Sequence, residues 1–119
     1  MTPVLILFNF SPARAAALSS CARDCGFEVR IAAGSEHRTP LASISGPTPA
    51  DALTQPAFTD EMLVFAASGR EKVFAFLDLM RERGVDPVAL KAVLTPVNVL
   101  WTPEELHREL KKEHQALSR

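Results

Sequence analysis

The sequence has no excess of charge of either sign and no long hydrophobic run. Its 13 lysines and arginines are balanced by 14 aspartates and glutamates, so the formal net charge at pH 7 is -1. Without a basic field the chain has little attraction for nucleic acid or anionic lipid. The first apolar run, Val4 to Phe8, is too short to cross a membrane and lacks the flanks of a signal peptide. These absences predict a cytoplasmic protein that binds neither nucleic acid nor membranes.

Residues for cofactor and redox chemistry are also scarce. The two cysteines, Cys21 and Cys25, are four residues apart on a predicted helix, a spacing that suits neither a disulfide nor a zinc knuckle. Neither of the Gly-rich phosphate-binding motifs occurs, which argues against a tight nucleotide site. His107 and His114 lie on one helix face with Lys111 between them, and this ammonium would repel a metal ion. We therefore expect no metal and no cofactor.

The beginning of the chain predicts a β-α-β unit within residues 1–33. Val4 to Phe8 is apolar without alternation, as in a strand that is covered on both faces. Ser11 can cap a helix, and Gly26 supplies the residue that commonly follows a helix end. The more alternating segment Phe27 to Ala33 indicates a second strand nearer the edge of the sheet.

A second unit, residues 61–95, follows a Pro-rich connection at residues 34–60. Its apolar strand, Met62 to Ala66, precedes a helix that we expect to begin with a capping box at Ser68 and to stop at Gly84. The last predicted strand runs from Leu90 to Thr95. Because both units show the same order of strand, serine cap, helix, glycine and strand, we interpret the chain as two β-α-β repeats.

Two such units can form a four-stranded sheet in two ways. If the connection crosses the sheet, all strands are parallel in the order 2-1-3-4; if it turns back, the result is a ferredoxin-like α+β sheet. We favour the parallel sheet, because apolar strands of this kind need cover on both faces. The expected architecture is a single α/β domain over residues 1–119, with a corner and a terminal helix in residues 96–119.

A parallel sheet would bring polar residues and three helix N-termini together at its carboxyl edge. The positive dipole ends at Ser11, Ser68 and Thr102 would favour a small anion there. Lys91, inside an otherwise apolar strand, either protects the sheet edge or contacts that anion. The candidate ligand-binding residues are Asn9, Ser11, Ser68, Gly69, Lys91, Thr95 and Asn98.

The segment that leads into the last helix carries a strong local signal. Thr102 and Glu105 have the spacing of a capping box, with Pro103 at the first helical position. Trp101 and Leu106 have the spacing of a hydrophobic staple. We interpret Trp101, Thr102, Glu105 and Leu106 as a structural corner that sets the angle of the helix.

This part of the chain also carries motifs of a known family. They are Lys91-Ala-Val-Leu-Thr95-Pro96, Asn98, Trp101-Thr102, and the helix residues Leu106, Glu109 and Glu113-His114. In these motifs the chain resembles the small bacterial domain of unknown function 3783 family. Weaker similarity extends to the first strand, to Thr39-Pro-Leu41 and to the strand at Met62, whereas Val97 and Val99-Leu100 are less polar than the family pattern. The family has no assigned activity, so the resemblance implies no catalytic residue.

The pattern of residues favours binding over catalysis. No spacing supports a Ser/His/Asp or Cys/His arrangement, so we expect a non-catalytic binding or regulatory module that self-associates as a homodimer. The alternative is an enzyme or sensor that acts on a small anionic ligand at the carboxyl edge. A concave polar edge would favour the ligand, and an exposed apolar patch would favour self-association. Apolar residues at Val97, Val99 and Leu100 favour the latter.

Overall fold

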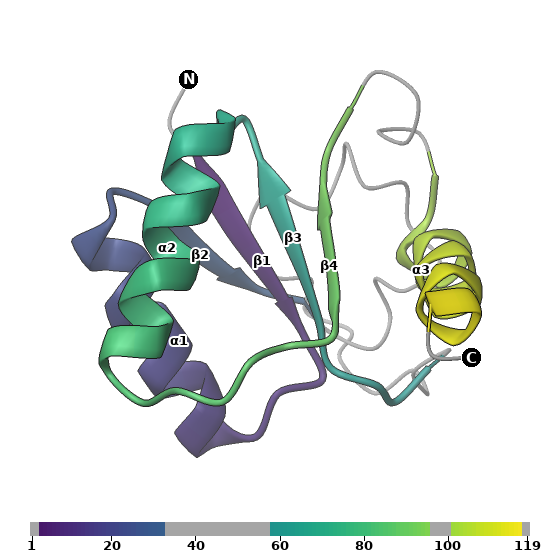
Figure 1. Ribbon diagram of the computed structural model, residues 1–119, viewed down its shortest axis with the longest axis horizontal. Coiled ribbons are helices and arrows are strands. Elements are labelled where there is room, and N and C mark those ends of the chain that lie inside the picture. The colour runs from purple at the N-terminus through teal and green to yellow at the C-terminus, as the bar shows by residue number, and fades with distance from the viewer. Residues whose placement is uncertain (1–2, 33–57, 96–100, 118–119) are drawn as a thin grey trace.

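The computed structural model describes residues 3–32, 58–95 and 101–117 of the chain (Figure 1). These residues form two β-α-β units followed by a terminal helix, as the repeated pattern predicts. The elements are β1 (Val4–Phe8), α1 (Pro12–Asp24), β2 (Glu28–Ile31), β3 (Met62–Ala66), α2 (Arg70–Glu82), β4 (Leu90–Val93) and α3 (Pro103–Leu117). Outside the described residues lie residues 34–57 of the predicted Pro-rich connection, and Asn98 with its aliphatic neighbours Val97, Val99 and Leu100.

The four strands form one mixed sheet in the order β2-β1-β3-β4. This order is the predicted one, but the prediction that all strands run parallel is wrong. β1 pairs with β2 and β3 pairs with β4 in parallel, whereas β1 and β3 are antiparallel, with Val4 opposite Ala66 and Phe8 opposite Met62. The second unit is therefore reversed, as expected of a connection that turns back. The strands of each unit remain direct neighbours, however, and are not split as in a ferredoxin-like sheet.

The prediction of strand direction was wrong because apolar strands do not reveal the direction of their neighbours. Burial on both faces of β1 and β3 requires cover on both faces of the sheet, and that cover can be provided in either strand direction. Asn9, directly after β1, donates from Nδ2 to the backbone oxygens of Phe58 and Asp60, at 3.0 and 2.9 Å. These bonds hold the chain that enters β3 at the edge where β1 ends, which is compatible with an antiparallel neighbour.

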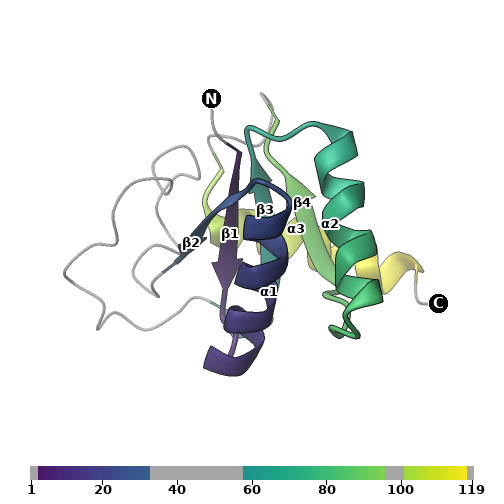
Figure 2. The ribbon, with the colours of Figure 1, turned by 90° about the vertical axis from the view of Figure 1, so that its left-hand side faces the viewer.

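The helices cover the two faces of the sheet unequally. α1 and α2 lie side by side on one face and α3 lies on the other (Figures 1 and 2). Side chains of β1 alternate between two apolar clusters, as the pleat of a strand requires. The cluster under α1 and α2 includes Leu5, Leu7, Leu18, Phe27, Leu63, Phe65, Phe76 and Met80. The cluster under α3 consists of Ile6, Phe8, Phe58, Met62, Val64, Leu90 and Leu106.

Most predicted helix boundaries are confirmed. Ser11 Oγ accepts from the backbone nitrogen of Arg14 at 3.3 Å, and Gly26 and Gly84 have positive φ angles of 88° and 69° after α1 and α2. The capping box predicted at Ser68 is wrong. Ser68 Oγ donates to the backbone oxygen of Gly69 at 3.1 Å, and Gly69 itself is the N-cap of α2, without a side-chain cap.

The capping box predicted before α3 is confirmed. Thr102 N donates to Glu105 Oε1 and Glu105 N donates to Thr102 Oγ1, both at 3.2 Å, which completes the capping box. Leu106 is 3% exposed in the cluster under α3, and Trp101 packs against the same cluster. Trp101 is partly rather than fully buried. No described helix has the length and apolarity needed to cross a membrane.

Candidate functional site

The reversal of the second unit separates the residues that were predicted to bind an anion. Asn9 and Ser11 follow β1 at the edge of the sheet where β3 begins, whereas Ser68 and Gly69 follow β3 at the opposite edge. Asn9 and Ser11 are engaged in the contacts described above, and the Ser68 hydroxyl bonds to Gly69. The predicted convergence of the helix N-termini at Ser11 and Ser68 is therefore wrong.

Two further predicted site residues, Lys91 and Thr95, lie towards opposite ends of β4. Lys91 pairs with Leu63 near the start of β3, so it lies towards the edge that holds Asn9. Its Nζ donates to the backbone oxygen of Val88. Thr95 follows β4 and lies towards the opposite edge. The structure thus places Lys91 and Thr95 in different environments.

Charged side chains gather at the edge where β1 ends and β3 begins, and Asp60 is central to them. Asp60 Oδ2 lies 2.9 Å from His107 Nε2 and accepts from Lys111 Nζ at 3.1 Å. The hydrogen bond with His107, followed by that with Lys111, lowers the pKa of the Asp60 carboxyl below its ordinary value. The His107 ring also stacks on Phe58, with centroids 4.3 Å apart and planes inclined by 11°. One carboxylate and one aromatic ring thus attach α3 to the chain segment before β3.

Glu61 forms a second ion pair beside Asp60. Arg14 on α1 contacts both carboxylate oxygens of Glu61, through Nε at 3.0 Å and Nη2 at 3.1 Å. Arg14 Nη1 also donates to the backbone oxygen of Asp86 at 2.8 Å. The hydrogen bond to Glu61 raises the pKa of Arg14. The bidentate ion pair with Glu61 and the hydrogen bond to Asp86 together hold α1, the start of β3 and the loop before β4 in place.

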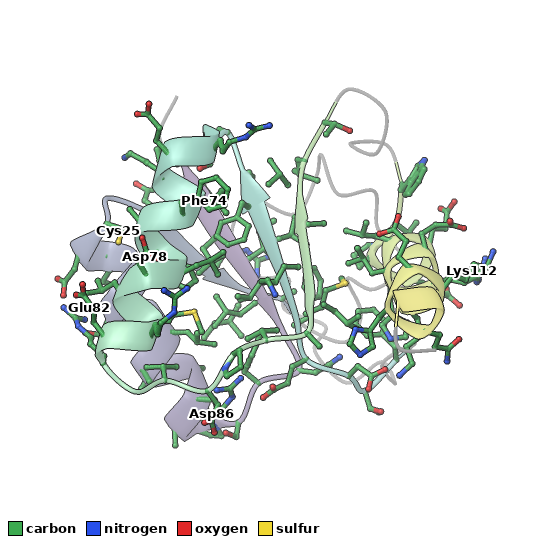
Figure 3. All side chains as sticks on the ribbon, in the orientation of Figure 1. Cys25, Phe74, Asp78, Glu82, Asp86 and Lys112 are labelled. Atoms are coloured by element: carbon green, nitrogen blue, oxygen red, sulfur yellow. The ribbon has the colours of Figure 1, made fainter. Side chains whose placement is uncertain are left out.

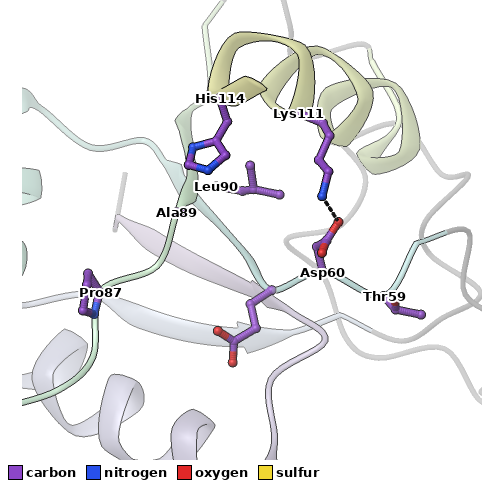
Figure 4. A pocket seen from close by; sticks show the side chains of 8 residues that line it. Thr59, Asp60, Pro87, Ala89, Leu90, Lys111 and His114 are labelled. Carbon is purple, nitrogen blue, oxygen red and sulfur yellow. Dashed lines mark hydrogen bonds and ion pairs between the residues drawn. The ribbon is translucent and has the colours of Figure 1, made fainter. Parts of the chain in front are cut away.

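A concave cavity of about 520 Å³ opens at this charged edge. Figure 4 shows its walls: Lys111 and His114 project from α3 on one side, and Pro87 and Ala89 precede β4 on the other. The full lining consists of Thr59, Asp60, Glu61, Pro87, Ala89, Leu90, Lys111 and His114. Both carboxylates in the wall already have cationic partners. We call this space the α3-side cavity.

The comparisons with known proteins concern the second unit and α3. Residues 61–117 match the model of a family described as a domain of unknown function, DUF3783. The resemblance to DUF3783 is confirmed. No curated protein and no solved structure gives a significant match to this chain. The DUF3783 match starts at Glu61, so the weaker similarity expected in the first unit lies outside it.

The DUF3783 region contributes most of the α3-side cavity. Glu61, the residues before β4, Lys111 and His114 lie within the match, whereas Thr59, Asp60 and Arg14 precede it. The DUF3783 region alone therefore lacks two partners that complete its ion pairs. Among the described residues, no group of three or more His, Cys, Asp or Glu side chains could hold a metal ion.

The sequence contained a partial signal for this cavity. The seven-residue spacing of His107 and His114 around Lys111 placed three side chains on one helix face, and an acidic pair, Asp60-Glu61, directly precedes an apolar strand. Nothing local connects these two features, because the ion pair of Asp60 with Lys111 spans 51 positions in the chain. Sequence reasoning consequently missed Asp60, Glu61 and Arg14 as members of one site.

Proposed function

We propose that the protein is a non-catalytic binding module that holds a small anion in the α3-side cavity. The observation that supports this proposal is the cavity itself, a concave space of about 520 Å³ whose lining combines polar side chains with the apolar Pro87, Ala89 and Leu90. Small ligands bind in such concave spaces, where a few convergent polar groups fix their orientation. A concave polar edge is also the feature that distinguishes a ligand-binding module from a purely structural subunit.

The charges in the walls favour an anion over a cation. Glu61 is occupied by Arg14, and Asp60 by His107 and Lys111. An ammonium group has three donors, and Lys111 directs one of them to Asp60. An anion can therefore accept a hydrogen bond from Lys111 without breaking that ion pair, and His114 lines the same cavity. A metal cation would have to compete with these resident positive charges for the carboxylates.

The contacts of His107 support a binding role rather than a catalytic one. Its Nε2 faces Asp60 and its ring face covers Phe58, and its side chain is only 16% exposed. Both contacts attach α3 to the segment before β3. A histidine held in this way acts as a packing and hydrogen-bonding residue. An anion that joins Lys111 and His114 to the sheet edge would strengthen the same attachment, and its binding would thereby regulate the stability of the fold.

A thermal-shift titration with phosphate, sulfate, acetate, magnesium and zinc tests the proposal. We expect the anions to raise the melting temperature with increasing concentration, because they bind the folded state. The stabilisation should be lost in Lys111→Met and reduced in His114→Ala. Lys112→Met is the matched control, since Lys112 is the next residue of α3, is 66% exposed and points away from the sheet (Figure 3).

The outcome of the titration separates the alternatives. Stabilisation by divalent metals without stabilisation by anions would contradict the assignment of charge. An equal effect of anions on Lys111→Met and on Lys112→Met would show that the salts act on the whole surface and would contradict the assignment to the α3-side cavity. Retention of the pairing between Asp60 and His107 keeps α3 attached in both lysine variants, so both are expected to fold.

Self-association as a homodimer in the cytoplasm is a further part of the proposal. Its support is apolar surface among the described residues: Ile31 is 56% exposed, Phe74 54% and Val93 38%. Ile31 lies on β2 and Val93 on β4, the two edge strands of the sheet. Apolar side chains on and beside a sheet edge are commonly covered by a second copy of the chain. Cys21 and Cys25 are both free thiols, as a reducing compartment would keep them.

A further inference from the structure

A second concave surface lies on the other face of the sheet, between α2 and β4. This space has a volume of about 270 Å³, and we call it the α2–β4 groove. Its apolar wall is formed by Leu77, Met80, Val85, Pro87 and Val88, and its two charged lining residues are Arg81 and Lys91. No carboxylate among the described residues lines it. The groove therefore combines an apolar surface with positive charge alone.

The apolar part of the groove is anchored in the main core. Met80 is 3% exposed and Val88 2% exposed, and both belong to the cluster under α1 and α2. Leu77 and Val85 pack against this cluster but remain partly exposed. The floor is thus rigid, because its buried side chains are fixed by close packing. An apolar ligand would find a preformed surface there.

Apolar surface continues beyond the groove itself. Phe74 precedes Leu77 by one turn of α2 and is 54% exposed (Figure 3). Val93 follows Lys91 by two positions on β4, so both side chains point to the same face of the sheet, and Val93 is 38% exposed. The same side of the molecule therefore offers an extended apolar strip beside two cations.

Both cations of the groove keep donors for a ligand. Arg81 is 81% exposed, and its ion pair with Asp78, 3.5 Å away, is an exposed contact within one helix and contributes little. Lys91 Nζ donates to the oxygen of Val88 at the groove wall, and an ammonium group has two further donors. A guanidinium and an ammonium beside an apolar floor match a carboxylate that carries an aliphatic tail.

We infer that the α2–β4 groove binds a small amphipathic anion, an aliphatic carboxylate. Its oxygens contact Arg81 and Lys91, and its tail lies on Leu77, Met80 and Val88. The affinity then depends on both parts of the ligand: each methylene group that becomes fully buried strengthens binding by up to about fourfold. This inference does not rest on anion binding in the α3-side cavity, because the groove uses Arg81 and Lys91 instead of Lys111 and His114, although Pro87 lines both spaces.

Isothermal titration with octanoate tests this inference, with hexanoate, acetate, 1-octanol and octylammonium as comparison ligands. We expect octanoate to bind most tightly, hexanoate more weakly, and acetate and octylammonium not measurably. Lys91→Met keeps an apolar stem of similar length and should weaken octanoate binding about tenfold, as should Arg81→Gln, since each removes a charge-assisted hydrogen bond. Arg108→Gln is the matched control, because Arg108 is an exposed arginine of α3, on the other face.

Amide chemical-shift mapping of the wild-type chain provides a second measurement that needs no variant. Octanoate should shift the amides of α2 and β4 and leave those of α3 unchanged. Equal binding of octanoate and octylammonium, or unchanged affinity in both Lys91→Met and Arg81→Gln, would overturn the inference. Chemical-shift changes confined to the amides of Lys111 and His114 would also overturn the inference, and would support binding in the α3-side cavity instead. If anions fail to bind in the α3-side cavity, the inference about the groove is not affected.

Discussion

Asn9 and Ala67 occupy equivalent positions in the two β-α-β units and share an unusual backbone conformation. Each directly follows the last residue of its strand, and their φ angles are 65° and 55°. Asparagine tolerates the left-handed region, and Asn9 also donates hydrogen bonds to the chain before β3. Alanine has neither advantage. The internal repeat therefore includes the backbone turn, but the second unit makes that turn with a less suitable residue.

Replacing Ala67 by glycine should stabilise the fold. The left-handed conformation costs a residue with a Cβ atom about 1 to 2 kcal/mol, whereas glycine adopts it freely. Part of this gain is offset by the greater entropy of glycine in the unfolded chain, so we expect a net increase of about 0.5 to 1 kcal/mol. Urea denaturation measures it. Asn9→Gly should instead destabilise the fold, because it removes two hydrogen bonds. A loss of stability in Ala67→Gly would contradict this prediction.

Asp60→Asn should remove a pH-dependent contribution to stability. The folded state lowers the pKa of Asp60 through His107 and then Lys111, so the contribution is present above the unfolded pKa of about 3.8 and is lost as the pH falls through the lower folded pKa. Because Asp60 and Lys111 are 44% and 43% exposed, we expect a loss of about 1 kcal/mol at pH 7. At pH 2 the variant and the wild type should be nearly equal.

Denaturation by urea at both pH values measures this difference, and Asp78→Asn provides its control. Asp78 also forms an ion pair, with Arg81, but this pair lies on the surface of α2 with its side chains 63% and 81% exposed. We expect it to contribute little at either pH. A difference between Asp60→Asn and the wild type that persists unchanged at pH 2 would assign the loss to packing instead of charge.

Trp101→Ala should destabilise the fold by about 2 kcal/mol. Full burial of a tryptophan would imply a loss of about 3 to 5 kcal/mol, but Trp101 is only partly buried against the cluster under α3. Leu106→Ala is the comparison, and we expect it to cost at least as much, about 2 to 5 kcal/mol, because Leu106 is 3% exposed. Equilibrium denaturation decides the matter. A loss below about 0.5 kcal/mol for Trp101→Ala would mean that the ring is available to a partner.

Static light scattering over a concentration series tests self-association. A homodimer has twice the chain mass of 13.0 kDa, and the fraction of dimer should rise with concentration. Phe74→Ser should lower the dimer fraction if the exposed ring lies in the interface, whereas Arg108→Gln on α3 should not change it. A monomer mass that persists at the highest soluble concentration would rule out the homodimer.

Local signals predicted most of the individual elements correctly. Unbroken apolar runs indicated the central strands β1 and β3, Gly26 and Gly84 marked two helix ends, and the box of Thr102 and Glu105 marked the start of α3. Each signal depends on interactions among residues a few positions apart, which is why the sequence was sufficient. The failure at Ser68 has a local cause as well: its hydroxyl bonds to the next residue rather than to α2.

Strand direction and the composition of the candidate site depend on distant contacts. The antiparallel pairing of β1 with β3 joins residues far apart in the chain, such as Phe8 and Met62, and apolar runs carry no information about strand direction. Asp60 meets His107 across 47 positions and Glu61 meets Arg14 across 47. The sequence therefore specified the two units and their capping residues, because these are local. The tertiary structure decided the relative direction of the two units, and therefore which charged side chains line the same cavity.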